Sequence, residues 1–254
     1  MLKRFIIGVL AILFIIPLSV EAQNWKLRRY EITGGIGTTN FFGDIGGTED
    51  LDNLAGFKDI QLRYTRPSFA FGARYRITGN MAVKLNLISG ITSGDDTTSR
   101  NEARRFAFNS TIFEPSLQFE YYVIPESVRA SSALFTHRGM INSFSRINIY
   151  LFGGLGAAFF SPTPKRDFIP VFTDNFSKFG LVFPIGVGLK YPISSRLALG
   201  LELGRRFTTT DYIDGYKSVH SKHNDTYYFG VFNVIYKIRT DRRGFPILRR
   251  QGLS

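Results

Sequence analysis

Segments in which apolar and polar residues alternate dominate this chain after its N-terminal region. Between Ser68 and Thr78, for example, apolar side chains occupy the odd positions, and Arg74 and Arg76 occupy two of the even ones. A period of two is typical of a β-strand whose two faces meet different surroundings. No segment reaches the roughly 18 consecutive apolar residues of a membrane-spanning helix. The pattern therefore predicts an all-β fold.

Residues 1–22 have the features of a cleaved secretory signal peptide. A basic start precedes an apolar stretch from Phe5 to Leu18, and small residues precede the expected cut after Ala22. We prefer a cleaved signal to a membrane anchor because the stretch is shorter than the about 20 residues that span a bilayer. The chain contains no Cys, which excludes disulfides, thiolate metal sites and a lipid anchor at the cut.

An exported chain with this alternation and with 25 Phe and 12 Tyr can cross a membrane as a closed barrel. We therefore expect the fold to be an eight-stranded antiparallel transmembrane β-barrel of the outer-membrane type, with localisation in the outer membrane. The alternative is a secreted β-sandwich, which would have to cover side chains such as Phe69 and Leu197 with a second sheet. We expect the barrel over residues 23–239 and a basic periplasmic tail over residues 240–254. The expected strands lie at about 28–39, 68–78, 81–91, 105–124, 146–160, 179–191, 197–207 and 225–238.

Two of these segments depart from simple alternation. In 105–124 the apolar positions are even before Glu114 and Pro115 and odd after them, so we expect a β-bulge there. In 225–238 apolar residues occur at both parities, which leaves its two faces unassigned.

The lengths of the connections predict how the barrel lies in the membrane. Outer-membrane barrels have short periplasmic turns and long outer loops. The connection 125–145 is the exception, because it is long and lies on the inner side. The expected outer loops are 40–67, 92–104, 161–178 and 208–224.

Charged residues of both signs fall on the inward face of the predicted strands. The interior of an eight-stranded barrel is only wide enough for side chains to fill it. Mixed signs let each charge find a partner, so we expect a buried plug, with solvated lumen residues that have no gating role as the alternative. The predicted interior charges are Glu31, Arg74, Arg76, Lys84, Glu120, Lys190, Glu202 and Arg206.

The sequence offers no convincing catalytic or metal site. His137, His220 and His223 lie in predicted connections, where no nucleophile and base can be placed together and no full set of metal ligands forms. We expect no enzyme activity and no cofactor. The net charge of +12 would indicate nucleic-acid binding in a cytosolic protein, but export excludes that partner.

The C-terminal region concentrates basic residues around a short apolar stretch. Clustered like charge is typical either of a solvated tail or of a segment that docks an acidic partner. The apolar stretch 245–248 favours docking to a periplasmic protein. The predicted docking residues are Arg239, Arg242, Arg243, Phe245, Ile247, Leu248, Arg249 and Arg250.

Several stretches resemble the outer-membrane barrel family that includes PorG of the type IX secretion system. They are Asn40-Phe41-Phe42-Gly43-Asp44-Ile45, Ile112-Phe113-Glu114, Leu117-Gln118-Phe119-Glu120, Tyr150-Leu151-Phe152-Gly153-Gly154-Leu155-Gly156, Pro184-Ile185-Gly186-Val187-Gly188-Leu189-Lys190-Tyr191, Leu199-Gly200-Leu201-Glu202-Leu203-Gly204-Arg205-Arg206 and Thr210-Asp211-Tyr212-Ile213-Asp214.

The resemblance implies a small barrel with a structural or assembly role, connected through its inner face to periplasmic parts of a secretion machine. The chain departs from the family pattern in its long 125–145 connection, in Pro115 and in its basic tail. Our leading hypothesis is a non-enzymatic outer-membrane barrel that is a structural or accessory component of a protein secretion complex. Its partners would be outer-membrane lipid and periplasmic or outer-membrane subunits of that complex. The alternative is a narrow channel or ligand-binding barrel gated by the interior charges.

Overall fold

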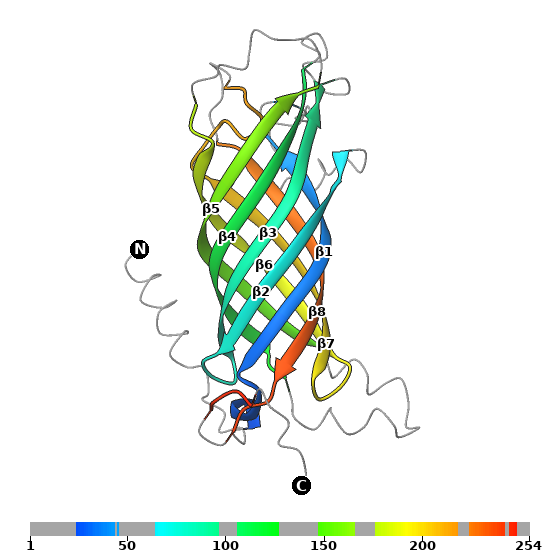
Figure 1. Ribbon diagram of the computed structural model, residues 1–254, viewed down its shortest axis with the longest axis vertical. Coiled ribbons are helices and arrows are strands. Elements are labelled where there is room, and N and C mark those ends of the chain that lie inside the picture. The colour runs from blue at the N-terminus through cyan, green and yellow to red at the C-terminus, as the bar shows by residue number, and fades with distance from the viewer. Residues whose placement is uncertain are drawn as a thin grey trace, which may run out of the picture.

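The computed structural model is a closed antiparallel barrel (Figure 1). It describes residues 24–43, 45, 64–96, 106–126, 147–165, 176–217, 224–241 and 244–247. Each strand in this part of the chain pairs with the next, and β1 pairs with β8 to close the barrel. This confirms the predicted eight-stranded barrel. The strands are β1 (Tyr30–Phe42), β2 (Arg66–Arg76), β3 (Met81–Asp95), β4 (Ala107–Ile124), β5 (Asn148–Pro164), β6 (Phe179–Pro192), β7 (Leu197–Thr208) and β8 (Thr226–Ile238).

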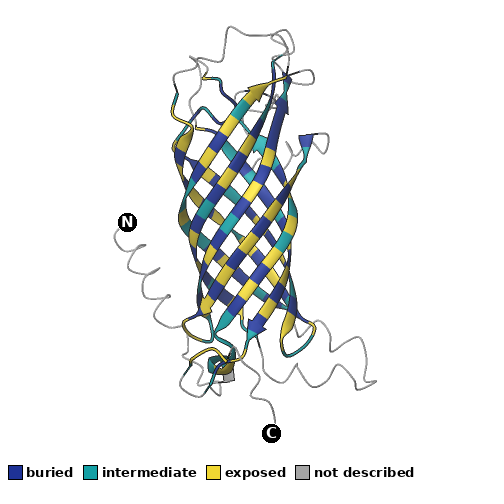
Figure 2. Cartoon of the chain, viewed as in Figure 1, coloured by how far each residue is buried: buried dark blue, intermediate teal, exposed yellow. Residues whose placement is uncertain are grey.

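Alternation along the strands separates the interior of the barrel from its exterior. Figure 2 shows buried and exposed residues following one another along the strands. In β2, Phe69 is 65% exposed while Ser68 and Ala70 on either side of it are buried. The exterior is therefore an apolar surface of Phe, Leu, Ile and Val side chains, as a barrel surrounded by lipid requires.

The two ends of the barrel differ. At one end, which we call the short-turn end, residues 77–80 and 193–196 connect their strands tightly. At the other, which we call the loop end, the connections are longer. Short turns lie on the periplasmic side of outer-membrane barrels. The connection between β4 and β5 lies at this end too, and most of it is outside the described residues.

The predicted bulge near Glu114 and Pro115 is wrong. β4 keeps one phase throughout, with Phe108, Ile112 and Glu114 all buried, and its register irregularity against β5 lies between Tyr122 and Ile124 instead. The prediction assumed that every apolar strand residue faces lipid. The loop-end half of the interior contains an apolar cluster beside polar residues such as Ser68 and Ser110, so Phe108 and Ile112 point inward without any change of phase.

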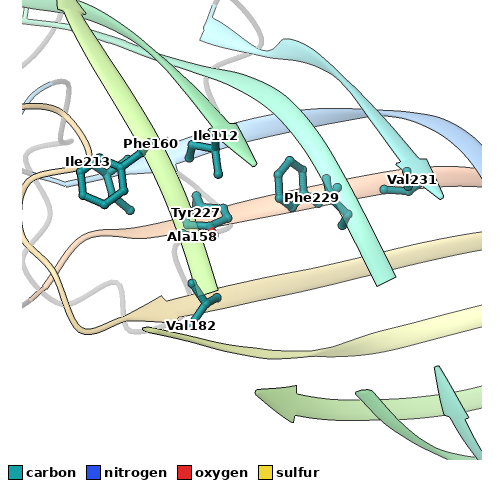
Figure 3. Close-up of a cluster of buried hydrophobic side chains, with 10 residues drawn as sticks. Ile112, Ala158, Phe160, Val182, Ile213, Tyr227, Phe229 and Val231 are labelled. Atoms are coloured by element: carbon teal, nitrogen blue, oxygen red, sulfur yellow. The ribbon is translucent and has the colours of Figure 1, made fainter. Parts of the chain in front are cut away.

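This apolar interior also explains why β8 could not be assigned from sequence. Tyr227, Phe229 and Val231 of β8 point inward, where they join apolar residues from other strands and Ile213 from the β7–β8 connection (Figure 3). Phe232, Val234 and Tyr236 are exposed on the outside of β8. The apolar cluster consists of Ala70, Ile88, Ile112, Ala158, Phe160, Val182, Ile213, Tyr227, Phe229 and Val231.

A 3₁₀-helix, η1 (Asn24–Arg28), and the start of the C-terminal tail lie together at the short-turn end (Figure 1). The backbone N–H of Thr240 donates to Leu27 O at 2.9 Å, and Ile247 N–H donates to Arg239 O at 2.8 Å. Gly244, with φ of 87°, makes the turn between them in a conformation that favours glycine. The described part of the tail is thus a hairpin held against η1. Within the described residues, no helix is both long enough and apolar enough to cross a membrane.

Candidate functional site: the barrel interior and its short-turn end

Arg74 of β2 is the centre of an ion network inside the short-turn half of the barrel. Its Nη1 lies 2.9 Å from Glu31 Oε2, its Nε lies 2.7 Å from Glu120 Oε2, and its Nη2 lies 3.4 Å from Glu202 Oε1. The Arg74 side chain is completely buried. A guanidinium has five donors in one plane, which allows it to serve three carboxylates at once.

Lys84 of β3 and Tyr150 of β5 hold the third of these carboxylates. Lys84 Nζ donates to both carboxylate oxygens of Glu202 at 2.7 Å, and the Tyr150 hydroxyl donates to Glu202 Oε1 at 2.6 Å. Arg74 and Lys84 are cross-strand neighbours. Like charges in that position repel each other. Glu202 reaches across from β7 and offsets this repulsion by binding both cations.

A fourth carboxylate, that of Glu126, binds three cations of the network at the mouth of the barrel. Glu126 lies two residues beyond the end of β4 and binds Arg76 Nη1 at 3.3 Å, Lys190 Nζ at 3.4 Å and Lys237 Nζ. Lys190 also binds Glu31 Oε1 at 2.5 Å, which joins this group to Arg74. In the described residues the network therefore contains five cations, all on strands, and four carboxylates.

A separate ion pair lies deeper in the barrel, towards the apolar cluster. Arg206 Nε lies 3.4 Å from Glu114 Oε1, and Arg206 Nη1 donates to Gly204 O at 2.6 Å. The Tyr227 hydroxyl donates to Glu114 Oε2 at 2.7 Å. The Glu114 carboxylate is fully buried, and both its oxygens have a partner. Through Tyr227 this pair contacts the apolar cluster.

Glycines on β6 provide the space that the interior aromatic rings occupy. Gly188 is the cross-strand neighbour of Tyr150, and a Cβ at this position would lie 2.1 Å from Cζ of the tyrosine. We expect Gly188→Ala to lower the free energy of unfolding by about 1–3 kcal/mol, because Tyr150 cannot move without releasing Glu202 and Arg74. Urea unfolding in detergent micelles, followed by circular dichroism, measures this.

The matched control for this prediction is Gly153→Ala. A Cβ at Gly153 of β5 would have no heavy atom within 4 Å. The same exchange there is expected to change the free energy of unfolding by no more than about 0.5 kcal/mol. Equal effects at the two glycines would show that the ring of Tyr150 is not fixed.

Glu126 makes the fold sensitive to acid. Burial raises the pKa of this carboxyl, and Glu31 also raises it, but Lys190, Lys237 and Arg76 outweigh both and lower it from 4.5 to about 2. A group with a lowered pKa stabilises the fold fully above its unfolded pKa and loses that contribution as the pH falls through the folded value. Glu126 therefore contributes stability that disappears between about pH 4.5 and about pH 2.

We expect this contribution to appear as a difference between the wild type and Glu126→Gln. The midpoint of urea unfolding is measured for both proteins from about pH 6 to about pH 2. The wild type should be more stable at pH 6, and the two curves should converge as the pH approaches 2. Parallel curves over the whole range would contradict the ion pairs at Glu126.

The structure places all eight predicted interior charges inside the barrel. Seven of them belong to the network around Arg74, and Arg206 belongs to the separate pair. Glu114, Lys237 and Glu126 also place charges inside the barrel and were not predicted. Glu114 was not predicted to face the interior because a bulge was expected beside it, although its position in β4 has the same parity as that of Glu120. Lys237 shares the parity of the inward residues of β8, whose faces were left unassigned from sequence, and Glu126 lies beyond any strand pattern.

The predicted docking residues fall only partly within the described residues. Arg239, Phe245 and Ile247 lie on the hairpin at the short-turn end, where Phe245 is 66% and Ile247 is 51% exposed. Arg242, Arg243, Leu248, Arg249 and Arg250 lie outside the described residues, as do His137, His220, His223 and most of the 125–145 connection. In the part of the chain that the structure describes, no group of three or more potential ligands could hold a metal ion.

Comparison with known proteins gives one family match and several similar structures. A model of the outer membrane protein beta-barrel domain matches residues 8–237. Curated proteins give no match. Neisserial surface protein A is 9% identical over 82% of this chain and 96% of its own, with a TM-score of 0.44. Ail of Yersinia pestis is 10% identical over 83% of this chain and 97% of its own, with a TM-score of 0.40. OprG of Pseudomonas aeruginosa is 13% identical over 84% of this chain and 97% of its own, with a TM-score of 0.40.

Proposed function

The chain belongs to the outer membrane protein beta-barrel domain family, and from this premise we propose that it is a sealed, non-enzymatic barrel that anchors a protein assembly to the outer membrane. In this proposal it is a structural or accessory component of a protein secretion complex of the type IX kind. Lipid surrounds the barrel, and the protein partner binds at the short-turn end. The type IX assignment rests on the sequence stretches that resemble the family that includes PorG.

The observation that carries this proposal is the pairing of the interior charges. Each of the six described cations inside the barrel lies within 4 Å of a buried or largely buried carboxylate. A water-filled pore needs polar groups that face water, whereas these groups face one another. In the part of the interior that the structure describes, these ion pairs also engage the ionisable groups that could otherwise serve as a base or nucleophile. The activity of such a barrel therefore lies in its surfaces.

The short-turn end is the surface that best fits a protein partner. Phe245 and Ile247 are exposed there on a hairpin that is tied to η1 by backbone hydrogen bonds, so they are presented in a fixed arrangement. Leu27 of η1 is also exposed, and Arg239 adds a positive charge beside them. Apolar anchors on an ordered segment with charges around them are typical of a docking site.

Crosslinking in native outer membranes tests the proposal. The tagged wild type and the variant Phe245→Asp/Ile247→Asp are crosslinked, purified and compared for bound proteins. We expect subunits of a secretion complex to be recovered with the wild type and lost with the double variant. The control is Ile193→Asp, which changes an exposed apolar residue in the β6–β7 turn of the same end and should keep the partners. Recovery of the barrel alone from all three proteins would contradict the docking role.

A further inference from the structure

We propose that Arg76, Lys190 and Lys237 form a carboxylate-binding site at the short-turn mouth of the barrel, which Glu126 occupies in this structure and which an acidic segment of a protein partner can occupy in its place. This inference deepens the proposed docking role and rests on it for the source of the carboxylate. The existence of the site itself follows from the geometry alone.

Two of the three cations, Arg76 and Lys190, are held in position by groups other than Glu126. Arg76 Nη2 donates to Gly79 O at 3.0 Å in the β2–β3 turn, and the Arg76 guanidinium lies 5.2 Å from the centre of the Tyr122 ring. Lys190 binds Glu31 at 2.5 Å. Lys237 is fixed through its backbone, whose N–H donates to Arg196 O at 2.7 Å. Because the contacts of Arg76 and Lys190 do not involve Glu126, these two cations keep their places when that carboxylate leaves. A preorganised set of donors binds an anion at a smaller entropic cost than mobile side chains would.

Glu126 differs from the other carboxylates of the network in two ways. Glu31, Glu120 and Glu202 are on strands, whereas Glu126 lies beyond the end of β4. Its side chain is 14% exposed, compared with 0% for Glu31 and 8% for Glu202. It is therefore the one carboxylate of the described network that reaches the interior from outside the barrel wall, and the one nearest to an approaching partner.

The charge balance defines what can replace Glu126. Without it, the described network has five cations on strands and three carboxylates, so its excess of positive charge rises from one to two, which favours an anion at the mouth. Unpaired buried charge is costly, which excludes a neutral replacement. The present occupant is a carboxylate carried by a peptide chain. A Glu or Asp side chain of a partner segment satisfies the same three donors with the same chemistry.

Chemical rescue in the full-length protein tests the site. Glu126→Ala removes the internal carboxylate and should lower the urea midpoint measured in detergent micelles. Sodium acetate should restore at least half of this loss in a saturable way, and sodium chloride at equal ionic strength should not. A peptide acetyl-Gly-Glu-Gly-amide should also restore the midpoint, and acetyl-Gly-Gln-Gly-amide should not. In the wild type Glu126 fills the site, so acetate and the two peptides should raise the urea midpoint no more than sodium chloride does.

Two variants locate the rescue. Glu126→Ala/Lys237→Met lacks one of the three cations, so its response to acetate should be lost. Glu114→Ala empties a buried carboxylate position beside Arg206, deep in the barrel, and the peptide should not stabilise it. If Glu126→Ala does not fold, Glu126→Gln is used in its place, because Gln keeps the size of the side chain. The urea midpoint of Glu126→Gln should then rise more with the Glu peptide than the midpoint of the wild type does.

The outcomes separate this inference from the proposed function. No response to acetate or to the Glu peptide beyond chloride, in either variant, overturns the site even if crosslinking recovers a partner. A response to acetate without a response to the peptide overturns the partner segment as the occupant. Rescue by both probes together with a failed crosslinking experiment leaves the site in place and contradicts the docking role instead.

Discussion

Replacing Arg74 with Met is expected to lower the free energy of unfolding by about 3–5 kcal/mol, because it leaves buried carboxylates without their shared cation. Glu120 is the most affected, since Arg74 contacts both of its carboxylate oxygens, at 2.7 and 2.9 Å. Glu31 keeps Lys190, and Glu202 keeps Lys84. Urea unfolding in detergent micelles, followed by circular dichroism, measures the loss.

Arg196→Met is the control for this prediction. Arg196 lies exposed in the β6–β7 turn, so its replacement is expected to change the free energy of unfolding by less than about 0.5 kcal/mol. Arg74→Met combined with Glu120→Gln should be more stable than Arg74→Met alone, since it removes the charge that was left unpaired. Equal losses for Arg74→Met and Arg196→Met would show that the network does not stabilise the barrel.

Replacing Lys84 with Met has the second largest expected effect, a loss of about 3 kcal/mol, at the lower end of the range for a broken buried pair. Lys84 contacts both oxygens of Glu202 at 2.7 Å. Glu202 keeps the Tyr150 hydroxyl at 2.6 Å and Arg74 at 3.4 Å, which limits the loss. The same unfolding experiment measures it.

The double variant Lys84→Met/Glu202→Gln tests the pair itself. We expect it to recover at least about half of the loss of Lys84→Met, because both charges are gone and Gln still offers Tyr150 an acceptor. Lys178→Met, at an exposed position beside β6, is the control and should be nearly neutral. Additive losses at Lys84 and Glu202 would mean that the two residues do not interact.

The strands could be predicted from sequence because the two faces of a barrel wall differ so strongly. Where lipid meets one face and charges fill the other, as in β2 and β3, one parity is apolar and the other is polar. Arg74, Lys84 and Glu202 stand out on such strands as charges in otherwise apolar segments. Their burial followed from the narrow interior of an eight-stranded barrel.

The remaining features could not be predicted because they depend on the interior as a whole. The interior contains an apolar cluster, in which Ile112 and Phe229 face inward with the same chemistry as lipid-facing residues. In β4 and β8, apolar residues therefore occur at both even and odd positions, and the sequence does not show which face is inward. Which carboxylate binds which cation depends on register and on the strands that face each other across the lumen. Glu126, which has no strand parity, can be placed only by the structure.

Conductance measurements on the purified protein in planar lipid bilayers test most directly whether the barrel is sealed. Because the described interior charges are paired and an apolar cluster lies in the loop-end half, we predict no reproducible unitary conductance for the wild type. Defined unitary steps that change when Lys84→Met or Glu120→Gln is introduced would contradict the sealed barrel. They would establish instead a narrow channel gated by these charges.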